Sequence, residues 1–236
     1  MNEAKPAPIE IETDAPRAAT HRALPYVVPM AAFLGLSAVE GMFPGPLWYP
    51  WLYALKIAIV SGLVWACRST WRDLAPRPSG GALALAIALG LAVAAVWVGL
   101  DGLYPIPKFL GTRAAFDPNE LPKVGRWAFL AVRFAGLVLL VPLMEELFWR
   151  SFLMRWVIDP EFTKVPIGRV TPPALAATSV LFALAHPEWL PALLTGLAWA
   201  WLVARTKNLS ACVVSHATAN LALGVYVVLT GDWKYW

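Results

Sequence analysis

The feature that most constrains the fold is a series of long apolar segments. The cleanest one, residues 81–100, is rich in Ala, Gly and Val and contains no charged residue. A helix that spans a bilayer needs about 20 predominantly apolar residues, and several other runs in this chain approach that length. Long apolar runs of this kind indicate membrane helices rather than strands. The sequence therefore predicts an all-α, polytopic membrane helix bundle of seven or eight helices.

Composition agrees with this fold class and excludes some functions. The chain is 59% hydrophobic and 14% charged, against roughly 25% charged residues in an average soluble domain. The formal net charge of +4 suits loops that face anionic lipid. Because the basic residues are scattered among loops, we expect the lipid bilayer as a partner and no nucleic acid. Cys67 and Cys212 are far apart in sequence and indicate no disulfide framework.

We expect one integral membrane domain over residues 25–236, preceded by a disordered polar tail over residues 1–24. Arginines in the tail and in the loop 68–78 predict a cytoplasmic N-terminus. The expected helices cover residues 26–43, 48–67, 81–100, 125–158, 172–186, 189–204 and 209–229. The long segment 125–158 is either one helix bent at Pro142 or a spanning helix followed by a separate interfacial one.

Two adjacent carboxylates and an arginine interrupt this long segment, at Glu145, Glu146 and Arg150. Charges at membrane depth are costly, so they are kept where they pair or take part in function. On a helix, Glu146 and Arg150 lie four residues apart and can form an ion pair. Glu145 points about 100° away and can face something else. The alternative is that the three residues only mark the boundary between membrane and water.

The other polar residues at membrane depth fall in later helices. His186 ends one helix, and the i, i+4 spacing places His216 and Asn220 on one face of another. A lone histidine in a membrane usually makes a structural hydrogen bond between helices. Here, two histidines, an asparagine and Glu145 all need buried partners. We expect them to meet around one water-filled cavity.

Such a set could hydrolyse a peptide bond without a covalent intermediate. A glutamate beside a histidine can hold a water and take its proton, and a second histidine and an asparagine amide can donate hydrogen bonds to the oxyanion. Ser151, Ser179 and Ser215 lack an activating pattern. Cys212 shares a helical face with His216, so a thiol nucleophile is an alternative, although an inert apolar cysteine is favoured.

One glutamate and two histidines could instead coordinate zinc with an open position. The HExxH signature is absent, and an arginine one turn from the carboxylates disfavours a cation there. We therefore expect no cofactor and no metal, with a zinc-dependent membrane protease as the alternative.

Two questions stay open at this point. Glu40 and Lys56 could pair inside the bundle, or extend separately toward the interface. Glu145 is expected near the cytoplasmic end of its helix, whereas His186 lies about 20 Å into a helix that starts on the same side. These depths disagree unless the helices tilt or the number of crossings is wrong by one.

The ordered motifs EExxxR, FxxxH and HxxxN resemble the CPBP family, which holds the type II CAAX prenyl endopeptidases and their bacterial relatives. The matching residues, within 125–231, are Glu145, Glu146, Arg150, Phe182, His186, His216 and Asn220. The resemblance implies an intramembrane glutamic endopeptidase without an essential metal. It further implies that Glu145 and His186 activate the water, that His216 and Asn220 form the oxyanion site, and that Glu146 and Arg150 hold the helix in place.

The segments 182–189, 205–209 and 231–233 are similar to CAAX-protease-related proteins that accompany exosortase and PEP-CTERM sorting systems. This resemblance implies a bacterial inner-membrane protein that acts on a membrane-anchored protein or peptide, with such a sorting system as a partner. Some bacterial relatives have no shown protease activity. A non-catalytic membrane scaffold or immunity-type protein is therefore the alternative function.

Overall fold

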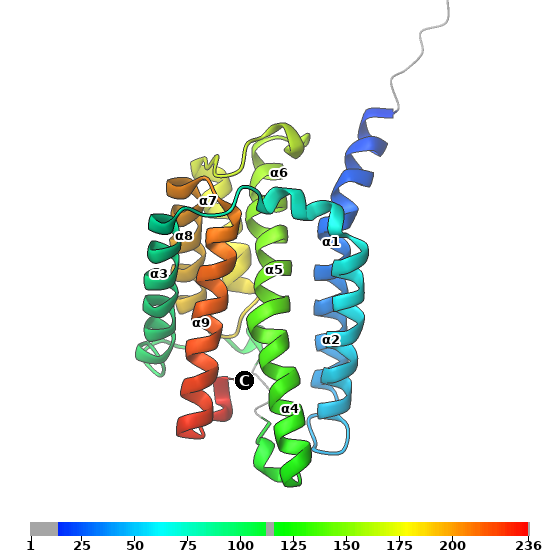
Figure 1. Ribbon diagram of the computed structural model, residues 1–236, viewed down its shortest axis with the longest axis vertical. Coiled ribbons are helices and arrows are strands. Elements are labelled where there is room, and N and C mark those ends of the chain that lie inside the picture. The colour runs from blue at the N-terminus through cyan, green and yellow to red at the C-terminus, as the bar shows by residue number, and fades with distance from the viewer. Residues whose placement is uncertain (1–13, 112–115, 236) are drawn as a thin grey trace, which may run out of the picture.

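The computed structural model describes residues 14–111 and 116–235, and the long elements within these ranges are helices packed side by side (Figure 1). Within that part of the chain, five helices are long and apolar enough to cross a membrane. The number of long helices lies within the predicted range, and the chain is an all-α integral membrane bundle. The helices are α1 (Asp14–Gly41), α2 (Tyr49–Ala66), α3 (Gly80–Gly99), α4 (Lys123–Ala135), α5 (Val141–Glu146), α6 (Met154–Ile158), α7 (Pro172–Leu184), α8 (Trp189–Thr206) and α9 (Leu209–Thr230).

The predicted polar tail is partly helical. Residues 1–13 lie outside the described residues, but α1 begins at Asp14, so the expectation of disorder is wrong for residues 14–24. The prediction of disorder rested on the polar composition of these residues. The helix nevertheless extends into them from the apolar segment that follows, because each added residue gains a hydrogen bond once a helix is nucleated. The remaining helix boundaries differ from the predicted ones by a few residues.

The segments α4, α5 and α6 run as one helix of 36 residues, Lys123–Ile158. The continuity agrees with the first of the two predicted alternatives, and the bend at Pro142 stays a prediction. Two π-helical segments, Gly136–Leu140 and Leu147–Leu153, interrupt its α-helical geometry. π-segments of this kind widen a helix locally and occur often at functional sites. Here they lie on either side of the short α5 that carries Glu145 and Glu146.

The disagreement in depth between Glu145 and His186 disappears in this structure. Glu145 comes thirteen residues before the end of α6 at Ile158, and His186 comes fourteen residues after the start of α7 at Pro172. At helical rise both are about 20 Å from the same end of the bundle, where α6 ends and α7 begins (Figure 1). The expected position of Glu145 near its helix end was wrong, because thirteen residues of the same continuous helix follow it.

A helical hairpin of α7 and α8 brings His186 into the bundle. α7 ends at Leu184, so His186 lies just beyond the helix. The prediction that the helix includes His186 is therefore wrong. Pro187 follows His186 directly. A residue before a proline is disfavoured in α-helical geometry, which explains the end of the helix. The two arms pack closely, since a Cβ on Gly196 of α8 would lie 3.0 Å from the Ser179 Cα of α7.

Close contact between α3 and α9 fixes the helix that carries His216 and Asn220. A Cβ on Gly90 would lie 2.3 Å from the Ser215 carbonyl oxygen and 2.8 Å from the Thr218 Cβ. Small residues permit this approach of two helix backbones in a membrane. The start of α9 is held by Asn208, whose side chain accepts from the Ala211 N–H at 2.9 Å and donates to the Pro76 carbonyl oxygen at 2.6 Å.

Candidate active site

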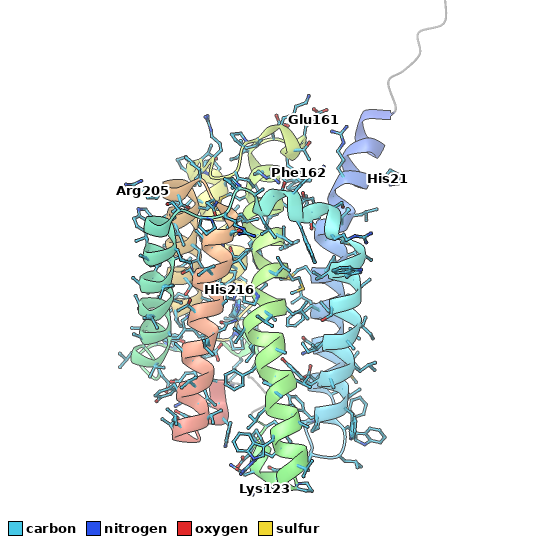
Figure 2. All side chains as sticks on the ribbon, in the orientation of Figure 1. His21, Lys123, Glu161, Phe162, Arg205 and His216 are labelled. Carbon is cyan, nitrogen blue, oxygen red and sulfur yellow. The ribbon has the colours of Figure 1, made fainter. Side chains whose placement is uncertain are left out.

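A cavity of about 420 Å³ lies among the helices, and the four residues predicted to be catalytic all line it. Glu145 comes from α5, His186 from the α7–α8 turn, and His216 and Asn220 from α9. Figure 2 shows His216 at mid-height in the bundle, far from Lys123 at one end and from Glu161 and Arg205 at the other. The structure thus brings together polar side chains that are widely separated along the chain.

The adjacent glutamates occupy different environments. Glu145 is 6% exposed and lines the cavity, whereas Glu146 is 0% exposed and packs behind it. The Glu146 Oε1 accepts from the Arg150 Nη1 at 3.1 Å. This is the ion pair predicted from the i, i+4 spacing, and both side chains are buried. Breaking such a pair by removing one partner costs about 3–5 kcal/mol, because a buried charge is left uncompensated.

Sequence reasoning missed the second partner of Glu146. The His216 Nδ1 lies 3.0 Å from the same Glu146 Oε1 that accepts from Arg150. A carboxylate that pairs with an arginine only accepts hydrogen bonds, so the Nδ1 of His216 carries a proton and donates it. The Nε2 atom is then the nitrogen available for other contacts. Glu146 therefore sets the orientation and the tautomer of His216.

His186 is oriented by Phe182, one turn before it. The His186 Nδ1 lies 2.7 Å from the Phe182 carbonyl oxygen. Because a carbonyl only accepts, the Nδ1 of His186 carries the proton of this hydrogen bond. The two rings also contact each other, with 4.6 Å between their centroids. The FxxxH motif thus supplies both a hydrogen-bond acceptor and a packing surface for the histidine.

Arg150 connects the surroundings of the two histidines. Its guanidinium carbon lies 4.8 Å from the centre of the Phe182 ring and 5.1 Å from that of Trp199. Trp199 in turn stacks on His216, with 4.2 Å between centroids and 27° between planes. A guanidinium group held over aromatic faces gains cation–π stabilisation that grows when the site excludes water. Arg150 thus stabilises the rings against which both imidazoles pack.

Asn220 is held by a carbonyl that the long helix leaves available. Its Nδ2 donates to the Leu137 oxygen at 2.8 Å. In the π-helical segment the Val141 N–H bonds to the Gly136 oxygen, five residues back. The next bond in that register would join residue 142 to Leu137, but Pro142 has no N–H. The amide of Asn220 replaces the missing donor, and its second hydrogen remains for the cavity.

The alternative nucleophiles do not line the cavity. Cys212 is 0% exposed, and its Sγ contacts the Trp199 carbonyl oxygen at 3.5 Å. The Ser151 hydroxyl donates to Asp73 Oδ2 at 2.5 Å, and the Ser215 hydroxyl accepts from Trp199 Nε1 at 3.0 Å. Ser179 is also buried and absent from the lining. Cys212 and Ser215 therefore have structural contacts in the core.

A second charged cluster lines the same cavity. Lys56 of α2 contacts Glu40 of α1, which is the first of the two predicted arrangements for this pair. Arg133 of α4 donates to the Tyr49 hydroxyl at 3.0 Å and lies over the ring of Tyr53 at 4.6 Å. The charged side chains are 4–7% exposed. The sequence indicated the first pair but gave no signal that Arg133 joins it.

Within the described residues, no group of three or more His, Cys, Asp or Glu side chains is placed to hold a metal ion. The carboxylate of Glu146 faces the arginine and His216 and does not line the cavity with Glu145. The absence of a metal from the reaction stays a prediction.

The comparisons with known proteins identify one family. Residues 127–222 match the family model described as "Type II CAAX prenyl endopeptidase Rce1-like". No curated protein and no solved structure matches the chain. The matched segment contains all three motifs, from Glu145 to Asn220. The exosortase-associated subgroup stays a prediction.

Proposed function

Because residues 127–222 are an Rce1-like domain of the type II CAAX prenyl endopeptidase family, we propose that this protein is a glutamic intramembrane endopeptidase that cleaves a membrane-anchored protein. The observation that carries the proposal is the meeting of Glu145, His186, His216 and Asn220 on one cavity inside the bundle. A family of proteases and a cavity lined by charged and polar side chains in an apolar bundle point to the same chemistry.

In the proposed reaction, Glu145 and His186 hold one water molecule. Glu145 takes a proton from the water as its oxygen attacks the carbonyl carbon of the scissile peptide bond, which gives a tetrahedral intermediate. The Nε2 of His186 accepts the second water hydrogen and orients the attack. When the C–N bond breaks, the proton on Glu145 passes to the leaving amine. The products are a new carboxylate and a new amine, and no bond to the enzyme forms.

His216 and Asn220 stabilise the oxyanion of this intermediate. Asn220 lines the cavity and uses one amide hydrogen for the Leu137 oxygen, and its second amide hydrogen would donate to the oxyanion. His216 can donate from Nε2 when its ring carries both protons, and the Glu146 carboxylate at Nδ1 is the partner such a cationic ring needs. Donors fixed in advance in a site that excludes bulk water are the most effective form of transition-state stabilisation.

The test is cleavage of a membrane-peptide substrate by the purified full chain in detergent. Glu145→Gln keeps the shape of the side chain but cannot take a proton, so we expect turnover to fall by about 10³-fold or more. The thermal unfolding midpoint should stay unchanged. Glu161→Gln, on a half-buried carboxylate that pairs with Lys164 at the end of the bundle, is the matched control and should keep full activity. Full activity of both Glu145→Gln and His186→Ala would contradict the proposal.

We also propose a bacterial inner-membrane location with a cytoplasmic N-terminus. The end of the bundle at which α1 begins (Figure 1) carries more basic residues than the other end, among those described. They are Arg22, Arg68, Arg72, Arg77, Lys164, Arg169, Arg205 and Lys207, against Lys108, Lys123, Arg126 and Lys234. An excess of Lys and Arg in short loops marks the cytoplasmic side.

A further inference from the structure

A hollow lined by arginines lies at the end of the bundle where α1 begins, apart from the cavity that holds Glu145. It has a volume of about 370 Å³. Its lining, which we call the basic hollow, consists of Arg22, Arg72, Asp73, Arg155 and Thr163. None of these residues lines the larger cavity. Figure 2 labels His21 and Phe162, the chain neighbours of Arg22 and Thr163, at this end. The basic hollow is therefore a separate candidate binding site.

The least exposed residues of the basic hollow form an ion pair. The Arg155 Nη2 donates to the Asp73 Oδ2 at 2.7 Å. The same oxygen accepts from the Tyr26 hydroxyl at 2.7 Å and from the Ser151 hydroxyl at 2.5 Å. Arg155 also donates to the Ser151 and Val165 carbonyl oxygens. The Asp73 side chain is 13% exposed and that of Arg155 is 5% exposed. The charge of Asp73 is thus already offset within the protein.

The other two arginines are available to an external partner. Arg22 has no hydrogen bond or ion pair among the described residues. The Arg72 Nε lies 3.9 Å from the Asp73 Oδ1, beyond hydrogen-bond distance, and the Arg72 side chain is 67% exposed. Three arginines and one aspartate give the lining a formal charge of +2. The Thr163 hydroxyl can also donate. An anion with several acceptor oxygens, such as a phosphate, suits these donors.

The level of the basic hollow indicates a lipid phosphate. Arg22 is the second residue of the apolar span His21–Gly41. Arg155 lies three residues before the end of the span Lys123–Ile158. Both arginines therefore lie where an apolar helix leaves the hydrocarbon and enters the headgroup region. Basic pockets between membrane helices at this level bind anionic headgroups.

We propose that the basic hollow binds the phosphate of one anionic phospholipid. The Arg22 and Arg72 guanidinium groups donate to the phosphate oxygens, and the Thr163 hydroxyl supplies a further donor. These contacts would join α1 to the loop after α2 and to the loop after α6. A bound headgroup therefore holds together segments that are distant in the sequence. The proposal concerns binding alone and does not depend on the proposed protease activity.

The test compares phosphatidylglycerol with phosphatidylcholine that has the same acyl chains, each added to the full chain in detergent. Native mass spectrometry measures the affinity of the first bound lipid. We expect phosphatidylglycerol to bind at least about tenfold more tightly, because the choline ammonium offsets the phosphate charge. It should also raise the thermal unfolding midpoint, since a ligand that binds only the folded state stabilises it. Equal binding of the two lipids would overturn the inference.

The variant that tests the site combines Arg22→Gln with Arg72→Gln. We expect it to weaken the binding of phosphatidylglycerol by about tenfold or more. The matched control combines Arg77→Gln with Arg205→Gln, which removes two exposed arginines from the same end, outside the basic hollow. Both double variants should unfold at the wild-type temperature without added lipid, because all four side chains are exposed. An equal loss of affinity in the two would show a general attraction to positive charge and would overturn the site.

Inorganic phosphate separates a lipid from a soluble source of the same group. At the same concentration as the lipid, it should neither raise the unfolding midpoint nor displace phosphatidylglycerol, because it lacks the acyl chains that hold the headgroup at the membrane surface. Inorganic phosphate that displaces the lipid and stabilises the chain by itself would overturn the assignment to a lipid.

Discussion

At the scale of single residues, the adjacent glutamates differ because of their neighbours. Glu145 lines the cavity, whereas Glu146 is fully buried between Arg150 and His216. Two carboxylates of the same chemistry therefore have two environments, and the roles that we propose for them differ: Glu145 acts on the substrate and Glu146 positions His216. This division follows from the helical phase, since consecutive residues point about 100° apart.

The prediction at this scale concerns Glu146→Gln. The amide keeps the size of the side chain but loses the negative charge that faces the His216 Nδ1. We expect kcat to fall by about 10²-fold, the usual cost of one lost oxyanion donor, with little change in KM. Steady-state kinetic assays of the variant and the wild-type protein would check this. An unchanged kcat would show that Glu146 does not act through His216.

At the scale of elements, the irregular helix between Lys123 and Ile158 builds the site. Its first π-helical segment and Pro142 leave the Leu137 carbonyl to Asn220. Its second segment follows Glu146 directly and contains Arg150. A regular α-helix of the same length would satisfy the Leu137 carbonyl within itself and offer nothing to α9. The departures from α-helical geometry therefore fix the contact between this helix and the helix that carries the proposed oxyanion donors.

The prediction at this scale is that Pro142→Ala lowers activity without unfolding the protein. Alanine restores a backbone N–H that can bond within the helix, and it is a better helix former than proline. Asn220 then competes for its acceptor, so we expect cleavage to slow by about tenfold or more while thermal stability holds or rises. Pro173→Ala, at the start of α7, is the control. Full activity of Pro142→Ala would show that this contact does not matter for catalysis.

At the scale of the whole molecule, the sequence predicted more about chemistry than about geometry. The length of the apolar segments was sufficient to predict the helix bundle, because a chain that spans lipid must satisfy its backbone hydrogen bonds within helices or closed barrels. Polar residues in an apolar background were sufficient to indicate Glu145, His186, His216 and Asn220. In contrast, the contact between Glu146 and His216 joins residues 70 positions apart. No local sequence pattern shows that the face of α5 with Glu146 packs against the face of α9 with His216.

The remaining errors also have a physical origin. The π-helical segments could not be predicted, since they depend on how the long helix packs against α2 and α9. One example is Gly136, where a Cβ would lie 2.6 Å from the Tyr53 hydroxyl oxygen. The cluster around Arg133 likewise depends on the three helices α1, α2 and α4 meeting at one level. Interhelical contacts of this kind are fixed by tertiary packing and not by the spacing of residues along one helix.

The most direct test of the central claim compares the C-termini of membrane proteins in cells that carry the wild-type chain and in cells that carry Glu145→Gln at the same level. Mass spectrometry of C-terminal peptides reads the outcome. If the cavity is a protease site, a defined set of membrane proteins will carry new C-termini only when Glu145 is present. Identical C-termini in the two strains, with both proteins folded in the membrane, would contradict the account.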